Sequence, residues 1–410
     1  MKKLLSIVLA CAMLLTLSLA CVSCGGSGSA DPDFKVGAIL IGDDNEGYTY
    51  AHILGLKEAA KACGMKEDQI IFKYSIPEDE KCHDAAIDLV DQGCKVIFSN
   101  SYGHQTYMKQ AAQECPDVTF VSMTGDQAAT SGLKNYKNAF TNVYESRYVA
   151  GVVAGMKLAE LVADGKLTDA NYKDGNIKLG YVGAYPYAEV VSGYTAYFLG
   201  VKSIVENVTM QVTYTNSWFD ITAEGTVAEA LAADGCVMIA QHADSTGAPA
   251  AIQALYDKGQ VVYSIGYNID MLSVAPTAAL TSASNNWAVY YTYAFKAALA
   301  GEDIIQNWAE GYKTGAVEIT ALGESCAAGT KEKVDETISA LKDGTLHVFD
   351  TTKFTVNGAT LTEYLADVDG DFVGETNAIW DGYFHESDET LRSAPYFDIR
   401  IDGIVENNNN

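Results

Sequence analysis

The feature that most constrains this chain is a regular alternation of short apolar runs with amphipathic segments. The apolar runs are rich in β-branched and aromatic residues, as strands are, and the segments between them have helical spacing. The first part of the chain contains predicted strands at 34–42, 69–75, 94–100 and 118–123, separated by predicted helices at 52–64, 78–92 and 104–114. Strands that alternate with helices form a parallel sheet covered by helices on both faces. The sequence therefore predicts an α/β, doubly wound fold.

The same pattern then starts again after a long predicted helix at 144–162. The strand predicted at 176–184 (NIKLGYVGA) echoes the first one (FKVGAILIG), and further strands are predicted at 208–214, 235–242, 260–267 and 277–284, with helices at 188–206, 222–234, 248–258 and 285–301. We therefore expect two lobes, one formed by 34–142 with about 282–310 and the other by 143–281. We expect residues 311–403 to pack back on the lobes and residues 404–410 to be a disordered tail.

The first residues indicate export. Lys2 and Lys3 precede an uncharged apolar run at 4–20, which is followed by CVSCGGSGSA. This arrangement is typical of a bacterial export signal, and a Cys before a Gly/Ser-rich linker resembles a lipoprotein processing site. We favour lipidation of Cys24, because the linker begins directly after it, with Cys21 as the alternative. The prediction is a signal peptide at 1–23, a linker at 24–33 and an extracytoplasmic protein held at the cell membrane by lipid; an uncleaved anchor is the other interpretation.

Charge and motif content exclude several classes of function. The formal net charge of -26 repels phosphate backbones, so we expect no nucleic-acid partner. The nine cysteines form no CxxC pair beyond the leader, and no GxSxG, GxxxxGK[ST] or HExxH motif occurs. We therefore expect neither an enzyme nor a cofactor or metal site. The segment 367–375 (DVDGDFVGE) has Phe372 where an EF-hand calcium loop has Gly, so we interpret it as a solvated turn.

The carboxyl ends of the predicted strands are where a ligand would bind, because open parallel sheets bind ligands at that edge. Almost every one of these ends is followed by an aromatic residue, an Asn or an Asp. Asn and Asp are also common in turns and helix caps, so alone they favour a structural role. His52 and His242 are further candidates for a hydrogen bond to a ligand. The aromatic residues are Tyr48, Tyr50, Tyr102, Tyr185, Tyr187, Trp218, Phe219, Tyr267 and Trp287. An aromatic-lined cleft between two lobes suits a flat polar molecule, since one stacked base contributes roughly 1–3 kcal/mol.

Several stretches resemble the basic-membrane-protein family of substrate-binding lipoproteins, which is related to the purine nucleoside receptors of bacterial ABC importers. They lie in order along about 35–295 and read KVGAILIGDDNEGYTYAHILGLKEA, NVYESRYVAGVVAGM, GYVGAYPYAEVVSGYTAYFLGVKS, TNSWFD, IAQHADS, YSIGYNIDM and LTSASNNWAVYY. The resemblance implies a type I periplasmic-binding-protein fold with a hinge and a purine ligand in the cleft between the lobes. It also implies an ABC permease as partner, and we expect the protein to be a monomer.

The resemblance also implies roles for single residues. Tyr48 matches an aromatic that stacks on the base, and Tyr185 matches the aromatic of the second lobe. Asn268 stands where nucleoside binders have Asp, and Asn285 where they have Lys, so we favour an adenine-like base over a nucleoside. The predicted ligand-binding residues are Asp44, Asn45, Tyr48, Tyr50, Tyr102, Tyr185, Trp218, Asp244, Asn268, Asn285 and Trp287.

In the YTNSWFD stretch, Trp218 is predicted to lie flat against the ligand and Phe219 to point into the core. Asn216 and Asp220 are candidates both for capping the next helix and for touching the ligand. Two other functions stay open. One is a binding protein for another small polar ligand such as a sugar, and the other is a sensory surface lipoprotein.

Overall fold

The computed structural model describes residues 32–387 and 392–407. The predicted signal peptide, most of the linker and both candidate lipidation sites, Cys21 and Cys24, lie outside these residues. No helix of the described part is both long and apolar enough to cross a membrane. The six cysteines within it are free.

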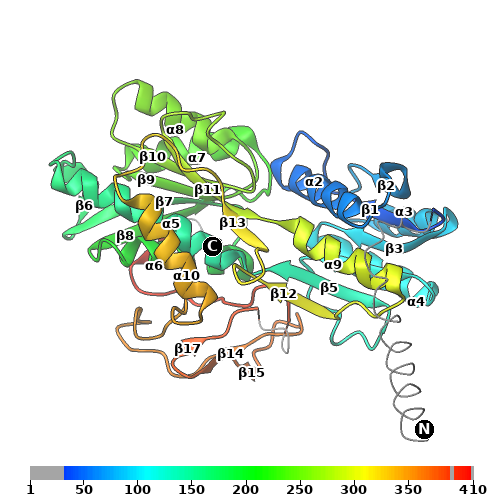
Figure 1. Ribbon diagram of the computed structural model, residues 1–410. Helices are drawn as coiled ribbons and strands as arrows, with labels where there is room; N and C mark the ends of the chain where they lie inside the picture. The colour runs from blue at the N-terminus through cyan, green and yellow to red at the C-terminus, as the bar shows by residue number, and fades with distance from the viewer. Residues whose placement is uncertain (1–31, 388–391, 408–410) are drawn as a thin grey trace, which may run out of the picture.

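The first lobe is built on a six-stranded parallel sheet (Figure 1). Its strands, in spatial order, are β12 (Asn307–Glu310), β5 (Tyr136–Thr141), β4 (Thr119–Met123), β3 (Cys94–Ser99), β1 (Lys35–Ile39) and β2 (Ile70–Lys73). On β3, Val96 and Phe98 pack into one core while Ile97 packs into another. The helices of the first core are α2 (Gly47–Ala62) and α9 (Trp287–Ala300); those of the second are α3 (Glu80–Asp91) and α4 (Gln105–Glu114). Helices thus cover both faces of the sheet, as the alternation predicts.

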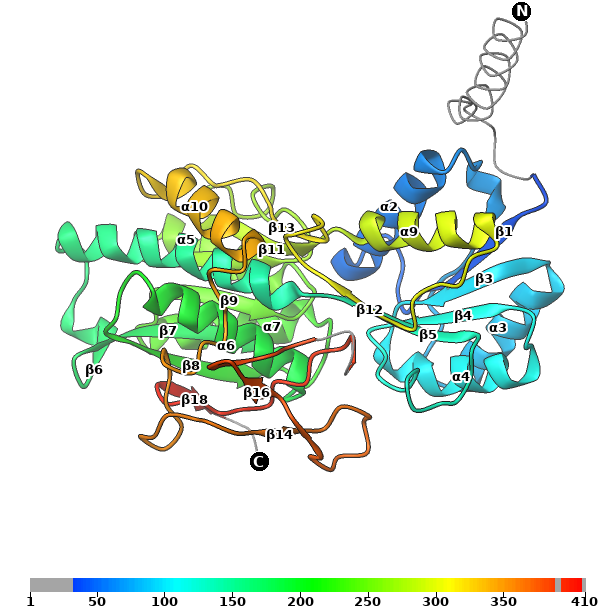
Figure 2. The ribbon, with the colours of Figure 1, turned by 60° about the horizontal axis from the view of Figure 1, so that its bottom comes forward.

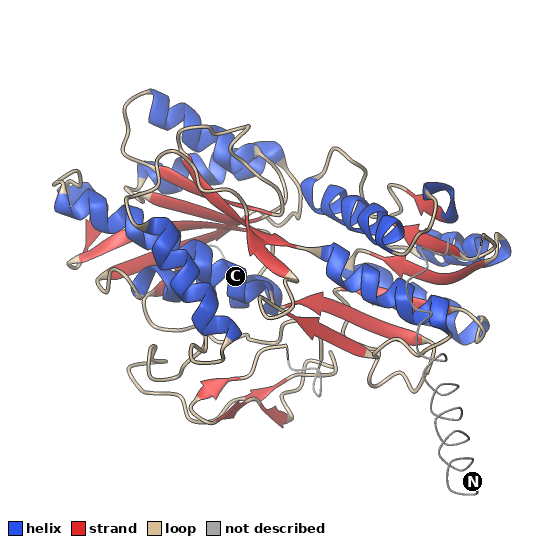
Figure 3. Cartoon of the chain, viewed as in Figure 1, coloured by secondary structure: helices blue, strands red, loops and turns tan. Residues whose placement is uncertain are grey.

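The second lobe repeats this plan around a longer sheet (Figure 3). Its strands, in spatial order, are β13 (Val317–Ile319), β11 (Ala279–Asn285), β10 (Tyr263–Tyr267), β9 (Met238–His242), β7 (Asn176–Gly183), β8 (Val208–Tyr214) and β18 (Ile404–Glu406). All neighbours are parallel except β13, which runs antiparallel to β11; the short β6 (Tyr172–Lys173) pairs antiparallel with β7. Helices α5 (Val143–Ala163) and α6 (Ala188–Lys202) cover one face, and α7 (Ile221–Ala233) and α8 (Gly247–Asp257) cover the other.

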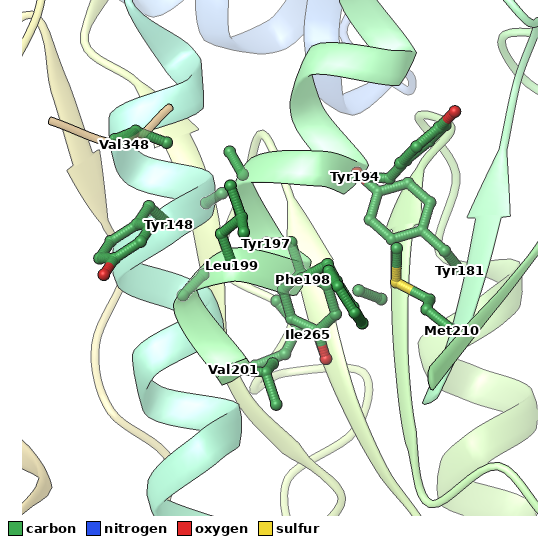
Figure 4. Packing of buried hydrophobic residues seen from close by; sticks show 14 of the residues in the cluster. Tyr148, Tyr181, Tyr194, Tyr197, Phe198, Leu199, Val201, Met210, Ile265 and Val348 are labelled. Carbon is green, nitrogen blue, oxygen red and sulfur yellow. The ribbon is translucent and has the colours of Figure 1, made fainter. Parts of the chain in front are cut away.

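Helices α5 and α6 cross in direct backbone contact. A Cβ atom at Gly151 on α5 would collide with the carbonyl oxygen of Tyr197, and one at Gly200 on α6 would collide with that of Tyr148. Around this crossing the second lobe has its largest apolar core, and Figure 4 shows Tyr148, Tyr197 and Phe198 within it. The small residues of the Ala- and Gly-rich helix therefore let two helices approach without side chains between them.

The chain passes between the lobes three times, from β5 to α5, from β11 to α9 and from β12 to β13. These crossings are bonded to each other: Thr141 Oγ1 donates to Asn285 Oδ1, and the Asn142 amide donates to the Glu310 carbonyl over 2.8 Å. Because Asn285 still pairs with Val317 of β13, the late strand belongs to the second sheet throughout. The first lobe therefore resumes at about residue 286, not at 282.

The carboxy-terminal segment, described at residues 346–387 and 392–406, packs mainly on the second lobe (Figure 2). It follows α10 (Thr330–Lys342) and contains two small hairpins, β14 (Leu365–Ala366) with β15 (Thr376–Asn377) and β16 (Ile379–Trp380) with β17 (Tyr383–Phe384). The prediction of a disordered tail from 404 is wrong for its first residues, because β18 adds a parallel strand to β8. Its Glu406 accepts hydrogen bonds from the hydroxyls of Tyr194 (2.8 Å) and Tyr214 (2.6 Å).

Candidate functional site

A cavity of about 350 Å³ lies between the lobes, at the carboxyl ends of the strands. Both lobes contribute to its wall, so it occupies the place where the sheet topology predicts a ligand. The lining residues are Ile41, Gly42, Asp43, Asn45, Glu46, Tyr48, Ser75, Asn100, Ser101, Tyr102, Thr124, Glu189, Trp218, Phe219, Asp244 and Tyr267.

Tyr48 is held rigidly on the wall of the first lobe. Its helix α2 begins earlier than predicted because the Glu46 carboxylate caps it, accepting the backbone N–H groups of Tyr48 and Thr49, each over 2.9 Å. The Tyr48 hydroxyl donates to the Asn100 carbonyl over 2.5 Å. A ring fixed at both ends costs little entropy when a ligand packs on it.

Trp287 and His52 lie behind Tyr48 and not in the cavity wall. Trp287 is 1% exposed and stacks on the His52 ring, with the centroids 4.3 Å apart, while Tyr48 meets His52 edge-on at 4.6 Å. His52 Nδ1 is 2.7 Å from the Tyr291 hydroxyl. The prediction that Trp287 touches the ligand is therefore corrected: its place at the start of α9 aims it into the core of the first lobe.

Trp218 stands on the opposite wall, at the end of a loop after β8. Its ring packs against those of Tyr185 (5.4 Å between centroids) and Tyr187 (6.2 Å), and its carbonyl accepts the Asp244 amide over 2.8 Å. Tyr185 thus packs against Trp218 and does not itself line the cavity.

Phe219 does not point into the core as predicted; it is 40% exposed and lines the cavity beside Trp218. The two neighbours face the same side because the chain leaves the extended conformation before them, with Asn216 at a φ of 56°. Asp220 caps α7, accepting the amides of Thr222 (3.0 Å) and Ala223 (2.9 Å). Of the two roles considered for Asp220, the structure shows capping.

Asp244, on the cavity wall, belongs to a hydrogen-bonded network with two asparagine side chains. Asn268 donates to Asp244 Oδ1 over 2.7 Å, and Asn285 Nδ2 lies 3.5 Å from Asn268 Oδ1. Only Asp244 of these three lines the cavity. Asn268 and Asn285 lie behind Asp244 and outside the cavity wall. Asn285 also accepts the hydrogen bond from Thr141 that links two of the crossings between the lobes.

Four carboxyl groups, those of Asp43, Glu46, Glu189 and Asp244, line the cavity and make it acidic. Burial raises the pKa of Glu189 to about 7, although the nearby Arg147 guanidinium opposes this rise. Burial also raises the pKa of Glu46 and that of Asp244, and the mutual repulsion of neighbouring carboxylates adds to the effect on Asp244. A carboxyl group with a pKa near 7, such as that of Glu189, exchanges between acceptor and donor near neutral pH, which suits a ligand that carries both kinds of group.

The positive charge near these carboxyl groups is that of Arg147. It is buried, its guanidinium lies 3.7 Å from the centroid of the Tyr267 ring, and its Nη1 donates to the Gln241 carbonyl. Arg147 and burial together lower the pKa of His242, whose Nε2 is 3.2 Å from Glu189 Oε1. His242 therefore contacts a cavity residue and does not itself line the wall.

The remaining predicted residues divide between the wall and its surroundings. Asn45 and Tyr102 line the cavity, whereas Asp44 and Tyr50 do not, and Tyr50 is exposed on α2. Glu46, Glu189 and Arg147 were not among the predicted site residues. Each sits within or just before a helix that follows a strand. Scanning the first turn of such helices for charged residues would have found Glu189 in α6, but Glu46 is the N-cap of α2, whose start was predicted only at residue 52.

The acidic turn at 367–375 is compact. Carboxylate oxygens of Asp367, Asp369, Asp371 and Glu375 all lie within 4.8 Å of one another. Asp367 accepts the amides of Gly370 (2.7 Å) and Phe372 (2.9 Å), and Phe372 takes a φ of 67°. The Phe thus adopts the backbone conformation for which a Gly is usually needed. The absence of a metal site here remains a prediction.

Comparison with known proteins agrees with this geometry. Residues 40–345 match the family described as ABC transporter substrate-binding protein PnrA-like. A purine-binding protein of Brucella abortus is 32% identical over 326 residues, which cover 79% of this chain and 85% of the relative. A protein of Haloferax volcanii, named for glucose binding in an ABC transporter, is 28% identical over 304 residues, 74% of this chain and 70% of that protein.

A solved structure shows the same fold. The ABC-transporter solute-binding protein of Aeropyrum pernix aligns with a TM-score of 0.63 at 16% identity, covering 77% of this chain and 93% of that one. The predicted two-lobe, type I periplasmic-binding-protein fold is confirmed. The extent of the family match and the identity to the Brucella protein establish the relationship. This chain belongs to the PnrA-like family of ABC-transporter substrate-binding proteins.

Proposed function

We propose that the cavity binds a purine, an adenine-like base or its nucleoside, and that the protein delivers this ligand to an ABC permease. The observation that carries the proposal is the pairing of aromatic faces from both lobes, Tyr48 on one side and Trp218 with Phe219 on the other, around carboxyl groups that include the buried Asp244. Aromatic side chains stack on the face of a flat ring whichever substituents the ring carries. Carboxylates accept hydrogen bonds from the ring N–H and exocyclic N–H groups of a purine. The purine-binding Brucella relative supports the same conclusion.

The two lobes already touch beside the cavity. Helix α2 of the first lobe already lies against the second, since a Cβ atom at Gly47 would be 3.3 Å from the Ile269 side chain and 3.4 Å from the Asp244 carbonyl. Closure would bury the ligand and offer the permease a surface that the open form lacks.

A sugar is the second candidate, favoured by the glucose-binding name of the Haloferax relative. Sugars also stack on aromatic rings, but their many hydroxyls need partners around the whole ring. The wall here has broad aromatic faces on both lobes, Tyr48 on one side and Trp218 with Phe219 on the other. We therefore rank the purine first.

A thermal-shift screen on protein unfolded, washed free of small molecules and refolded tests this proposal. We expect adenine, guanine or adenosine to raise the melting temperature and D-glucose to leave it unchanged, because a ligand that binds only the folded state stabilises it. A rise with glucose and none with any purine would contradict the proposal.

We further propose that the mature protein is a monomer held at the outer face of the cell membrane through lipid on Cys24. Labelled fatty acid should be incorporated into the wild type and into Cys21→Ala, but not into Cys24→Ala. Labelling of Cys24→Ala and not of Cys21→Ala would move the site to Cys21. Light scattering of the protein without its leader should give the mass of one chain.

A further inference from the structure

A second cavity, of about 490 Å³, adjoins the first one. The two share part of their walls, namely Tyr102, Thr124, Glu189 and Trp218, so they adjoin along these side chains. More than half of the second wall comes from the carboxy-terminal segment, between Tyr364 and Asp398. That segment lies beyond residues 40–345, which the family model matches, so this compartment is an addition to the part of the chain that defines the family.

The second cavity contains a buried acceptor that has no partner among the described residues. Asp126, which is 2% exposed, follows β4 in the first lobe. Its Oδ2 accepts the Tyr102 hydroxyl over 2.8 Å and lies 3.5 Å from Arg392 Nη1, but its Oδ1 has no hydrogen-bond partner in that part of the chain. A buried carboxylate oxygen without a donor is costly, so the site is suited to receive one.

Arg392 is already committed to other acceptors. Its Nε donates to the Ala394 carbonyl over 3.0 Å and its Nη2 donates to the Pro395 carbonyl. The rest of the wall adds the carboxylates of Glu189, Asp367 and Asp398 and aromatic faces, among them Tyr187, which is 51% exposed. Carboxylates outnumber the single guanidinium, and a phosphate group would therefore be repelled.

We infer that the second cavity is a subsite for a substituent of the ligand, one that is uncharged or cationic and carries a hydroxyl or amine donor for Asp126 Oδ1. The natural ligand would then be a substituted purine without phosphate. This inference rests on the proposed binding of a purine in the first cavity. Because the carboxy-terminal segment and the first lobe meet at Asp126 and Arg392, such a substituent would lie between these two parts of the chain.

Calorimetric titration with four probes tests the subsite: adenine, adenosine, adenine with a hydroxyalkyl or aminoalkyl group on N6, and adenosine 5′-monophosphate. We expect adenosine or an N6-substituted adenine to bind at least about tenfold more tightly than adenine, and the monophosphate to bind more weakly than adenosine. Using both attachment points covers either orientation of the base.

Two variants locate the effect. Ala188 lines only the second cavity, so Ala188→Trp should fill it and remove the gain from the substituent while adenine binds as in the wild type. Ala230→Trp, on the exposed face of α7, is the matched control and should keep the gain. Asp126→Asn keeps the side-chain shape but removes the charge, and should weaken the aminoalkyl probe more than the hydroxyalkyl one. Thermal melts check that each variant is folded.

These titrations distinguish a failure of the subsite from a failure of purine binding. If adenine binds as tightly as every substituted probe, or if Ala188→Trp weakens adenine and its derivatives equally, the subsite is refuted while purine binding stands. If no purine binds the wild type, the proposed function fails and the subsite fails with it.

Discussion

Replacing Trp218 by alanine should weaken purine binding far more than it destabilises the fold. The Trp218 ring packs against Tyr185 and Tyr187 on one side and faces the cavity with the other. Its hydrogen bond to the Asp244 amide is made by the main-chain carbonyl, so the substitution leaves it in place. The substitution should therefore remove only the contact between the indole ring and the ligand.

The magnitude follows from the stacking contribution of one aromatic side chain. At roughly 1–3 kcal/mol per base, losing the indole should raise Kd for adenine by about 5- to 150-fold. Trp218→Phe keeps a smaller aromatic face and should recover most of the affinity.

Isothermal titration with adenine measures this effect directly. Trp380→Ala is the matched control, because Trp380 is 38% exposed, stacks on His385 and lines neither cavity. If Trp218→Ala binds adenine within about twofold of the wild type, or if the Trp380 control weakens binding as much, the reasoning about the stacking wall is refuted.

Three further predictions concern the contact between the lobes, the packing of α5 on α6, and a buried carboxyl group of the second lobe. Gly47→Val should push the lobes apart and raise Kd for the ligand, since its side chain would press on Ile269 of the second lobe; equal affinity in a titration would contradict this. Gly151→Ala should lower the free energy of unfolding by about 1–3 kcal/mol, because its Cβ collides with the Tyr197 carbonyl, whereas Gly225→Ala on α7 has room and should be neutral or stabilising in urea unfolding. Burial raises the pKa of Glu224 to about 7, so the folded state holds a proton that the unfolded state releases above its ordinary value of 4.5. Stability should then fall as the pH rises between these two values, by at most about 3 kcal/mol from this group, and Glu224→Gln should flatten that slope in calorimetric melts; an unchanged slope would refute the assignment.

The alternation of apolar runs and helical segments predicted the two sheets because buried parallel strands need apolar residues on both faces, as Val96 and Ile97 show. It also predicted the edge at which the cavity lies. The orientation of single side chains did not follow. Trp287 starts a helix that packs closely on α2, where Gly55 has no side chain to keep it away, so the indole enters the core. Phe219 follows a residue with positive φ, and the alternation of a strand no longer applies to it.

Contributions from distant parts of the chain were the hardest to predict. Arg147 lies near the start of α5, and nothing in the local sequence signals that it faces Tyr267 and the region of Glu189. The carboxy-terminal segment has short strands without a clear period. Its role in the second cavity depends on contacts such as Arg392 with Asp126, 266 residues apart in sequence.

The most direct test of the central claim is calorimetric titration of the refolded, ligand-free protein with adenine and, separately, with D-glucose. The cavity geometry predicts saturable binding of adenine with a stoichiometry of about one and a Kd in the micromolar range or tighter, and no heat of binding with glucose. Saturable binding of glucose, with no binding of adenine or adenosine, would contradict the account.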